Sequence, residues 1–305
     1  MFQLLFSVKI PLFFHLSAIF MFDAIAQAVQ DQHLNFYGQH ITIRRLDQIH
    51  PHISGNKFFK LKYNILHAQQ LGLNKLLTFG GAYSNHIAAT AFAAQQFGLQ
   101  SVGIIRGEEL KNRPLNTTLM TAQRLGMHLH FVSREQYRQK QSTEFLAQLQ
   151  AVFPAHYIIP EGGTNALAIQ GCQEILKPSD TQYDTICCAV GTAGTITGLI
   201  EASLLHQQIL GFSALKGDFL QHEIKKYSTK TNWKVIDDYC FGGYAKITAE
   251  LMTFIDDFEN EFDIPLEQIY TAKMLYGLRD LIQKQYFAAN EKILVIHTGG
   301  LQGKL

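Results

Sequence analysis

Cysteine, tryptophan and charged residues are scarce in this chain of 305 residues. It has four cysteines and one tryptophan, and charged residues make up 17%. Cys187 and Cys188 are adjacent within an apolar run, which is a poor geometry for a disulfide and no spacing for a metal site. We therefore expect these two, with Cys172 and Cys240, to be reduced core thiols of a cytoplasmic protein, and we expect no metal site.

An excess of charge of either sign is also lacking. The 26 basic and 25 acidic residues leave a formal net charge of +1, so neither a nucleic-acid partner nor an acidic tail is indicated. There is no tandem repeat, low-complexity tract or Pro/Ser-rich linker. Hydrophobic residues make up 47%, which allows a sizeable core in one large domain or two medium ones.

The N-terminal segment is open to three interpretations. Residues 1–22 are strongly apolar, and Ala26-Gln27-Ala28 resembles a signal-peptide cleavage site. No basic residue precedes the apolar run, however, and Lys9 and Pro11 interrupt it. No uncharged stretch reaches the roughly 18 residues of a membrane span. We favour an extension upstream of a start at Met21 over a signal peptide or an anchor helix, and we expect no stable membrane insertion.

Short apolar runs alternate with helical patterns along most of the chain, and glycines separate many of them. This alternation predicts parallel sheets covered by helices on both faces. In such sheets, ligands bind at the carboxyl ends of the strands. The predicted strands are 75–79, 101–106, 127–132, 185–190 and 292–296, and the predicted helices are 85–97, 115–125, 135–152 and 194–203.

Three loops rich in glycine or hydroxyl groups lie at predicted strand ends: 80–86, 191–195 and 297–300. In Gly191-Thr192-Ala193-Gly194-Thr195, successive backbone N–H groups at a helix start would bind an anion; the alternative is a plain strand-to-helix turn. Ser84-Asn85-His86 also opens a helix, whose dipole favours a carboxylate. The alternatives there are a helix-capping role for Ser84 and a merely polar role for His86.

Lys57 stands between Asn56 and Phe58 in an apolar, glycine-containing segment. Desolvation lowers the pKa of a lysine, as Schiff-base chemistry requires. The alternative is a surface lysine in a Lys-rich stretch, which is what we expect of Lys60 and Lys62. One lysine with three such loops indicates a site for pyridoxal 5'-phosphate, in which the lysine holds the aldehyde and the loops hold the phosphate, the ring and a substrate carboxylate.

From about Ile41 to Gly300 the chain resembles the 1-aminocyclopropane-1-carboxylate (ACC) deaminase and D-cysteine desulfhydrase family, which has the tryptophan-synthase-β-like fold. The resemblance implies an α/β protein of two domains, each an open, twisted, mostly parallel sheet covered by helices, with the cofactor in the cleft between them. It implies a large domain of 21–62 with 158–305, a small domain of 63–157, and 1–20 as an extension. The matching blocks are Gly55-Asn56-Lys57 with Lys60-Leu61, Gly81 with Ser84-Asn85-His86, Pro160 to Asn165 with Gly171, Gly191 to Thr195, Ile269 to Met274, and His297 to Gly300.

The same resemblance assigns roles to individual residues. Lys57 would carry the cofactor, Asn85 would contact its ring hydroxyl, and Thr298 would face its pyridine nitrogen. Because threonine is a neutral partner, that nitrogen need not be protonated, which makes the cofactor a weaker electron sink, better suited to elimination than to long-lived carbanions. The phosphate would lie on Gly191, Thr192, Ala193, Gly194 and Thr195; the catalytic set would be Lys57, Ser84, Tyr270 and Tyr244; and the substrate would contact Ser84, Asn85 and His86.

The chain departs from the family pattern at several positions. Phe59 stands where the family usually has arginine, and Ala168 and Ala193 replace frequent glycines. Thr271 follows Tyr270 where ACC deaminases typically carry glutamate, which favours the desulfhydrase branch.

We therefore expect a D-cysteine desulfhydrase-like enzyme that converts D-cysteine to pyruvate, sulfide and ammonia. The alternatives are an ACC deaminase, which forms 2-oxobutanoate and ammonia, and a non-catalytic protein that binds pyridoxal phosphate. The expected partners are a small amino-acid substrate and a second copy of the chain, in a cytoplasmic homodimer.

Overall fold

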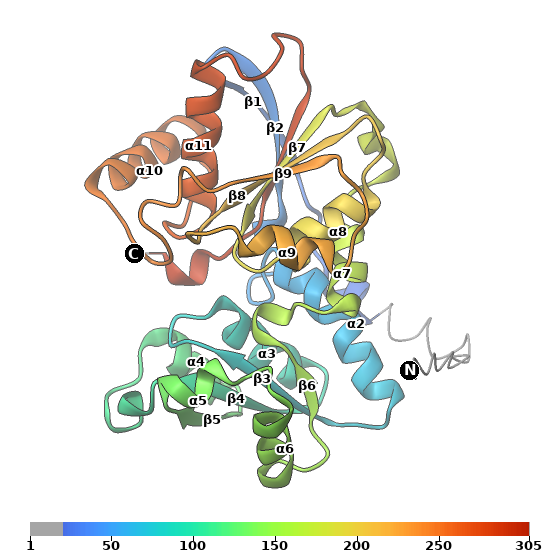
Figure 1. Ribbon diagram of the computed structural model, residues 1–305, viewed down its shortest axis with the longest axis vertical. Coiled ribbons are helices and arrows are strands. Elements are labelled where there is room, and N and C mark those ends of the chain that lie inside the picture. Colours follow the sequence, from blue (N-terminus) through green and yellow to red (C-terminus); the bar gives the residue numbers. More distant parts are fainter. Residues whose placement is uncertain (1–20, 305) are drawn as a thin grey trace.

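The computed structural model describes residues 21–304 and has two lobes, each built around one sheet (Figure 1). The interpretations offered for residues 1–20 lie outside the described residues. Within residues 21–304, no helix is long and apolar enough to cross a membrane. The α/β architecture of two helix-covered, mostly parallel sheets is as expected from the sequence.

The larger sheet has six strands in the order β1-β2-β10-β7-β8-β9. Only the edge strand β1 is antiparallel to its neighbour; the others run parallel. β7 and β10 are buried along their whole length, as expected for strands covered on both faces. The strands are β1 (Asp31–Phe36), β2 (Gln39–Arg45), β7 (Thr185–Val190), β8 (Gln208–Ser213), β9 (Trp233–Ile236) and β10 (Ile293–His297).

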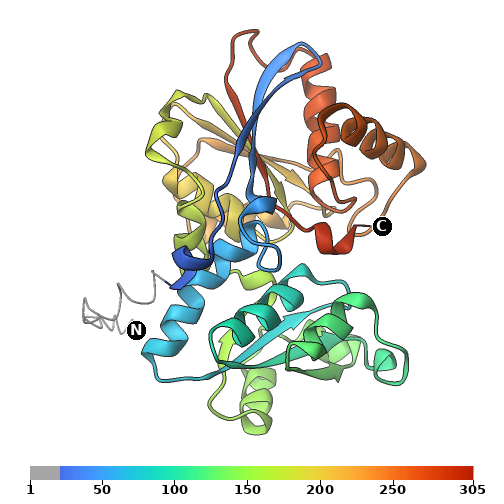
Figure 2. The same cartoon turned by 180° about the vertical axis from the view of Figure 1, so that it is seen from behind.

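Helices cover both faces of this sheet (Figure 2). One face packs against α2 (Asn56–Gln70), α7 (Ala166–Gln173), α8 (Gly194–Ala202) and α9 (Phe219–Lys225). The other face packs against α10 (Ala249–Phe262) and α11 (Thr271–Gln283). Short 3₁₀ turns complete the connections: η1 (Leu46–Gln48), η2 (Glu108–Asn112), η3 (Glu161–Gly163), η4 (Pro178–Gln182) and η5 (Leu301–Gly303).

The smaller sheet has four parallel strands in the order β5-β4-β3-β6. These are β3 (Lys75–Gly80), β4 (Gln100–Arg106), β5 (Met127–Val132) and β6 (Tyr157–Ile159). α3 (Asn85–Gln96) and α4 (Thr117–Arg124) cover one face, and α5 (Arg134–Arg138) and α6 (Thr143–Val152) cover the other. Most predicted elements lie within a residue or two of these bounds.

The single helix predicted over 135–152 is wrong, because the chain forms two helices there. α5 ends at Arg138, and the Ser142 hydroxyl accepts a hydrogen bond from the Phe145 N–H to start α6. A serine at this position satisfies one of the free N–H groups of a new helix, which favours a restart over a continuous helix.

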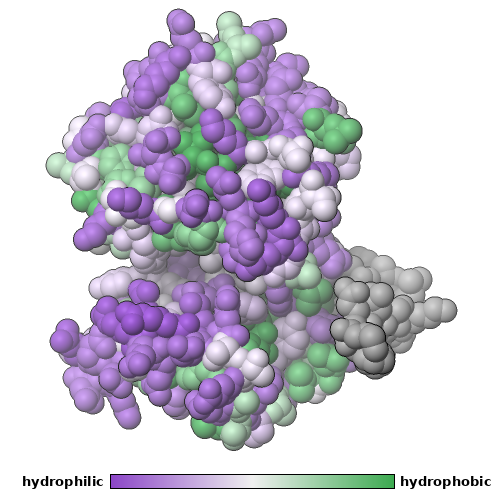
Figure 3. Space-filling model, viewed as in Figure 1, coloured by the Kyte–Doolittle hydropathy of each residue, from purple (hydrophilic) through white to green (hydrophobic). Residues whose placement is uncertain are grey.

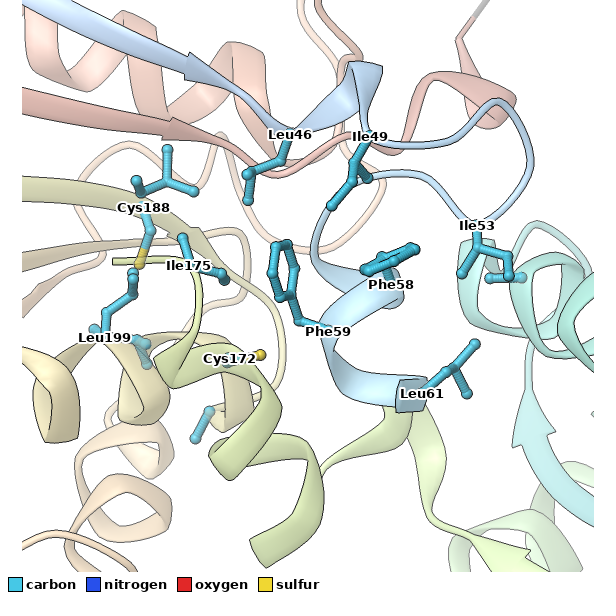
Figure 4. Packing of buried hydrophobic residues seen from close by; sticks show 14 of the residues in the cluster. Leu46, Ile49, Ile53, Phe58, Phe59, Leu61, Cys172, Ile175, Cys188 and Leu199 are labelled. Carbon is cyan, nitrogen blue, oxygen red and sulfur yellow. The ribbon is translucent and has the colours of Figure 1, made fainter. Parts of the chain in front are cut away.

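The start of α2 lies in the core of the larger lobe. Figure 4 shows Phe58 and Phe59 in the first turn of α2, with Leu46 and Ile49 nearby. Phe59 is only 8% exposed, so the position that is usually arginine in the family is part of the apolar core here. All four cysteines are free and buried, which confirms the expectation of core thiols.

Candidate functional site

A cavity of about 310 Å³ lies between the two lobes. The surface is hollowed there (Figure 3). The loops that follow β3, β7 and β10 all reach it, so the three strand ends predicted from the sequence do meet. Of the sequence-predicted site residues, the cavity is lined by Lys57, Ser84, Asn85, His86, Gly191, Thr192, Thr195, Tyr244, Tyr270 and Thr298, whereas Ala193 and Gly194 do not line it.

Lys57 is the second residue of α2 and faces the cavity. Its Nζ donates a hydrogen bond to Asn56 Oδ1 at 3.0 Å. Burial among protein atoms, with a smaller contribution from the nearby Lys60 cation, lowers the pKa of Lys57 to about 7. A large fraction of Lys57 is therefore an unprotonated nucleophile near neutral pH, as the chemistry of a carbonyl-binding lysine requires.

A glycine places Lys57 beside the loop after β10. Gly55 precedes α2 with a φ of +63°, and a Cβ atom there would lie 1.9 Å from the carbonyl oxygen of Thr298. The Asn56 N–H donates to that same oxygen at 3.2 Å. Because any side chain at residue 55 would separate the two segments, the glycine is needed for the lysine and Thr298 to share one cavity.

The loop of residues 191–195 joins the end of β7 to α8. A Cβ on Gly191 would lie 2.6 Å from Cε1 of Tyr270, so the loop backbone approaches that ring closely. Thr192 Oγ1 accepts a hydrogen bond from Thr164 Oγ1 at 2.8 Å. Thr195 Oγ1 accepts one from Asn56 Nδ2 at 2.8 Å, which ties the loop to the residue before Lys57.

Lys60 is buried, so the surface position predicted for it from the sequence is wrong. Lys60 is 1% exposed, and its Nζ donates to the Gly162 carbonyl at 3.0 Å, to Thr192 Oγ1 at 3.1 Å and to Thr164 Oγ1 at 3.3 Å. All three acceptors are uncharged. Within residues 21–304 no carboxylate forms an ion pair with Lys60, and burial lowers its pKa.

Lys62 is also buried rather than exposed, because it pairs with Asp23 and Glu174 at 3.1 and 2.8 Å. The spacing of Lys57 and Lys60 was the overlooked signal. Residues three apart lie on one face of a helix. If Lys57 faces a cavity, Lys60 is therefore expected to lie on the same side of the helix.

These observations fit pyridoxal phosphate. A buried cation without an anionic partner is costly, and a phosphate on Thr192 and Thr195 would supply the missing charge beside Lys60. The amine of Lys57 is depressed in pKa and faces the same space. The donor set therefore suits a group with an aldehyde at one end and a phosphate at the other.

Ser84, Asn85 and His86 open α3 on the opposite wall. The Ser84 hydroxyl accepts a hydrogen bond from the Ile87 N–H at 3.3 Å, so Ser84 caps the helix. A Cβ on Gly300 would lie 3.0 Å from Nδ2 of Asn85, which puts that amide against the loop after β10. The N-terminus of α3 thus offers backbone N–H groups to an anion in the cavity.

His86 is neutral in this environment. Burial, together with the neighbouring Lys57 and Lys60 cations, lowers its pKa well below the usual value. Its Nε2 lies 2.8 Å from Thr78 Oγ1, and the Thr78 hydroxyl donates its own proton to the Ile159 carbonyl at 2.9 Å. Nε2 must therefore carry the imidazole proton, which leaves Nδ1 as an acceptor without a partner in the described part of the chain.

Tyr270 and Tyr244 form one side of the cavity. Their ring centroids are 6.3 Å apart, with an angle of 59° between the planes. Burial raises the pKa of both hydroxyl groups, so both are protonated at neutral pH. Tyr244 is 42% exposed, whereas Tyr270 is the deeper of the two.

Glu267 was not found from the sequence, although it lines the cavity and is 1% exposed. Its Oε1 accepts hydrogen bonds from the N–H groups of Tyr270 and Thr271, each at 2.7 Å, and its Oε2 accepts one from Ile269 at 2.8 Å. Burial raises the pKa of this carboxyl, while these hydrogen bonds oppose the rise. Glu267 thus fixes the backbone that carries Tyr270, and no local sequence pattern marks it.

No group of three or more His, Cys, Asp or Glu side chains within residues 21–304 is arranged to hold a metal ion.

Comparison with known proteins places this chain in a family. The family model described as pyridoxal-phosphate-dependent enzyme matches residues 33–299. A putative 1-aminocyclopropane-1-carboxylate deaminase of Pyrococcus horikoshii is 32% identical over 286 residues, covering 87% of this chain and 86% of that protein. A mitochondrial protein of Arabidopsis thaliana, named as bifunctional D-cysteine desulfhydrase and 1-aminocyclopropane-1-carboxylate deaminase, is 30% identical and covers 87% of this chain and 73% of its own length.

Among solved structures, the crystal structure of an ACC deaminase homologue superposes with a TM-score of 0.78. It is 28% identical, and the match covers 94% of this chain and 95% of the other. The fold is therefore common to the two proteins.

Proposed function

The chain belongs to the family of pyridoxal-phosphate-dependent enzymes, and on that basis we propose that it acts as a D-cysteine desulfhydrase. The overall reaction would be the conversion of D-cysteine and water to pyruvate, hydrogen sulfide and ammonia. The choice of this reaction over ACC deamination rests on Tyr270 and Thr271. These two residues lie at the start of α11, and the first turn of that helix has no acidic residue.

Glu267 is the carboxylate nearest to that pair, but its oxygens are already engaged. Oε1 accepts from two backbone N–H groups and lies 3.3 Å from Thr271 Oγ1, and Oε2 accepts from a third N–H. Because both oxygens already accept hydrogen bonds from backbone N–H groups, Glu267 has few lone pairs left to contact the substrate. This supports elimination over the opening of a cyclopropane ring, for which the family typically has a glutamate at residue 271.

The proposed roles follow from where each group lies. Pyridoxal phosphate supplies the carbonyl group and the electron-withdrawing ring. Lys57 would hold the cofactor and, when displaced by substrate, remove the proton from Cα. Thr192, Thr195 and Lys60 would hold the phosphate.

On the substrate side, the N–H groups at the start of α3, Ser84 to His86, would bind the substrate carboxylate. Asn85 and Thr298 would contact the ring. Because both tyrosine hydroxyls keep their protons, Tyr270 and Tyr244 are suited to donate a hydrogen bond to a leaving thiolate. Ala193 and Gly194 would act only through the shape of the phosphate loop.

A second candidate is ACC deaminase. It is favoured by the name of the Pyrococcus horikoshii relative, and the Arabidopsis thaliana relative is named for both activities. We also propose that the large domain comprises 21–62 with 158–305 and the small domain 63–157, and that the enzyme is a cytoplasmic homodimer. Sedimentation of the purified protein and fractionation of cells test the last two proposals.

The deciding experiment measures two products from one preparation. Release of sulfide and pyruvate from D-cysteine should exceed release of 2-oxobutanoate from ACC, and Lys57→Ala should abolish both. Faster 2-oxobutanoate formation would move the protein to the deaminase branch. Thr271→Glu should shift the ratio toward ACC, and Thr271→Gln serves as its control of similar size without the charge.

A further inference from the structure

We propose that Arg106 recognises an anionic group on the side chain of an amino acid bound at this site, so that the site binds small amino acids with a second negative charge more tightly than their uncharged isosteres. This inference rests on the proposed function, since it concerns the amino acid bound at the same site.

Arg106 is the last residue of β4, and it lines the cavity that also contains Lys57. β4 pairs with β3, whose end leads into the loop that opens α3. One guanidinium nitrogen of Arg106 lies 3.6 Å from the point where a Cβ of Gly81 would stand. The guanidinium is therefore next to the loop that would receive the substrate carboxylate, within the same 310 Å³ space.

Arg106 is exposed to this space without an anion beside it. Among residues 21–304 it forms no ion pair and no side-chain hydrogen bond. The ring of Tyr137 lies 5.9 Å from the guanidinium carbon, and the arginine charge also acts on the hydroxyl groups of Tyr137 and Tyr244. By contrast, the buried Arg44 pairs with Asp31 and Asp180, and Arg45 pairs with Asp47. Arg106 thus keeps its hydrogen-bond donors available on the cavity side.

Glu161 also lines the cavity, and its carboxylate is held by other groups. Its Oε1 accepts a hydrogen bond from the Tyr137 hydroxyl at 2.6 Å, and its Oε2 lies 3.3 Å from Nζ of Lys140. Tyr137 is 3% exposed, so this arrangement is anchored in the core. Tyr137 contacts the arginine with its ring and binds the Glu161 carboxylate through its hydroxyl, and no ion pair joins Glu161 to Arg106 in the described part of the chain.

The other two cations of the cavity already have their own functions in the proposed site. Lys57 binds the aldehyde and Lys60 faces the phosphate loop, while the start of α3 takes the α-carboxylate. Arg106 is left for a further anion, and a planar guanidinium binds a carboxylate or a sulfonate through two parallel hydrogen bonds. Beside D-cysteine, the site should therefore bind small amino acids whose β-substituent ends in such a group.

The test uses two compounds of nearly equal size, D-aspartate and D-asparagine, as competitive inhibitors of D-cysteine turnover by the cofactor-loaded enzyme. D-aspartate should bind at least about tenfold more tightly, since a hydrogen-bonded charge pair is involved. In Arg106→Gln the ratio should fall to about one, and Arg106→Lys should restore part of it. Arg134→Gln, an exposed arginine outside the cavity, should leave the ratio unchanged.

Equal binding of the two compounds to the unmodified enzyme would overturn the inference. An equal loss of affinity for D-aspartate and D-asparagine in Arg106→Gln would also overturn it, because that result would assign Arg106 to the α-carboxylate instead. If D-cysteine is not turned over, the proposed function fails separately. The same ratio is then read from the change in cofactor absorbance as each inhibitor is added, with the L-enantiomers measured in parallel.

Discussion

The pKa of Lys57 leads to the sharpest prediction. Protein freed of cofactor should capture added pyridoxal phosphate at a rate that rises with pH through a midpoint near 7 and is level above it. Only an unprotonated amine attacks a carbonyl, and burial lowers the pKa of Lys57 from 10.5 to about 7. An exposed lysine would instead show a rise through its ordinary pKa of 10.5.

The size of the effect follows from the two pKa values. At pH 7 about one ordinary lysine in 3,000 is neutral, whereas a pKa of about 7 leaves about half of Lys57 neutral. Capture at neutral pH should therefore be on the order of a thousand times faster than by a free lysine side chain. Desolvation lowers the pKa of Lys57 more than the Lys60 cation does. Lys60→Met should therefore raise the midpoint of the rate profile, but by less than half of the difference between 10.5 and about 7.

The assay is stopped-flow absorbance of the lysine-bound cofactor from about pH 5 to about pH 9.5, where an ordinary lysine remains mostly protonated. Borohydride reduction and peptide mapping then identify the lysine that carries the adduct. Lys57→Ala should lose the fast phase. A rate that still climbs steeply at the upper end of this range, or an adduct on another lysine, would refute the reasoning.

Three further predictions concern stability and cofactor affinity. The free energy of unfolding of the cofactor-free protein should rise between about pH 7 and 10.5, because in that window the unfolded chain keeps a proton that Lys57 has lost; Lys57→Met should reduce this slope in denaturant titrations. Thr192→Val with Thr195→Val should weaken pyridoxal phosphate binding by about 1.5–3 kcal/mol for each lost charge-assisted hydrogen bond, measured by equilibrium titration, and unchanged affinity would contradict it. Glu267→Leu should lower the free energy of unfolding by about 1–3 kcal/mol for each of the three backbone N–H groups it leaves unpaired, whereas Glu267→Gln, which keeps an acceptor oxygen, should cost less.

Much of the fold and part of the candidate site could be predicted from the sequence. β5 was expected at 127–132 and lies there, because a short apolar run between Gly126 and a polar turn has few other conformations available. The loops at 80–86, 191–195 and 297–300 were expected at strand ends, and the parallel arrangement brings them to one cavity. Local patterns were sufficient wherever a glycine ends one element and the next begins.

What the sequence did not reveal depends on contacts between distant segments. Lysine usually lies at the protein surface, and Lys60 is buried only because α2 packs against α7 and α8. Glu267 lies in a segment without helical or strand periodicity, and its role appears only when the N–H groups of the next turn point at it. The break at Ser142 was missed because a capping serine is also compatible with a helix interior in a long polar pattern.

The start of α2 brings these features together. Lys57 and Lys60 lie in the first turns of a helix, where the aligned peptide dipoles already place positive charge, and no carboxylate among residues 21–304 forms an ion pair with either. Burying two amines is unfavourable, and burial lowers the pKa of both, with a smaller contribution from the Lys60 cation at Lys57. A ligand with a phosphate beside Lys60 and an aldehyde at Lys57 relieves both, because it neutralises one cation and consumes the other. The same arrangement that makes Lys57 reactive therefore makes the folded chain more stable with the cofactor than without it.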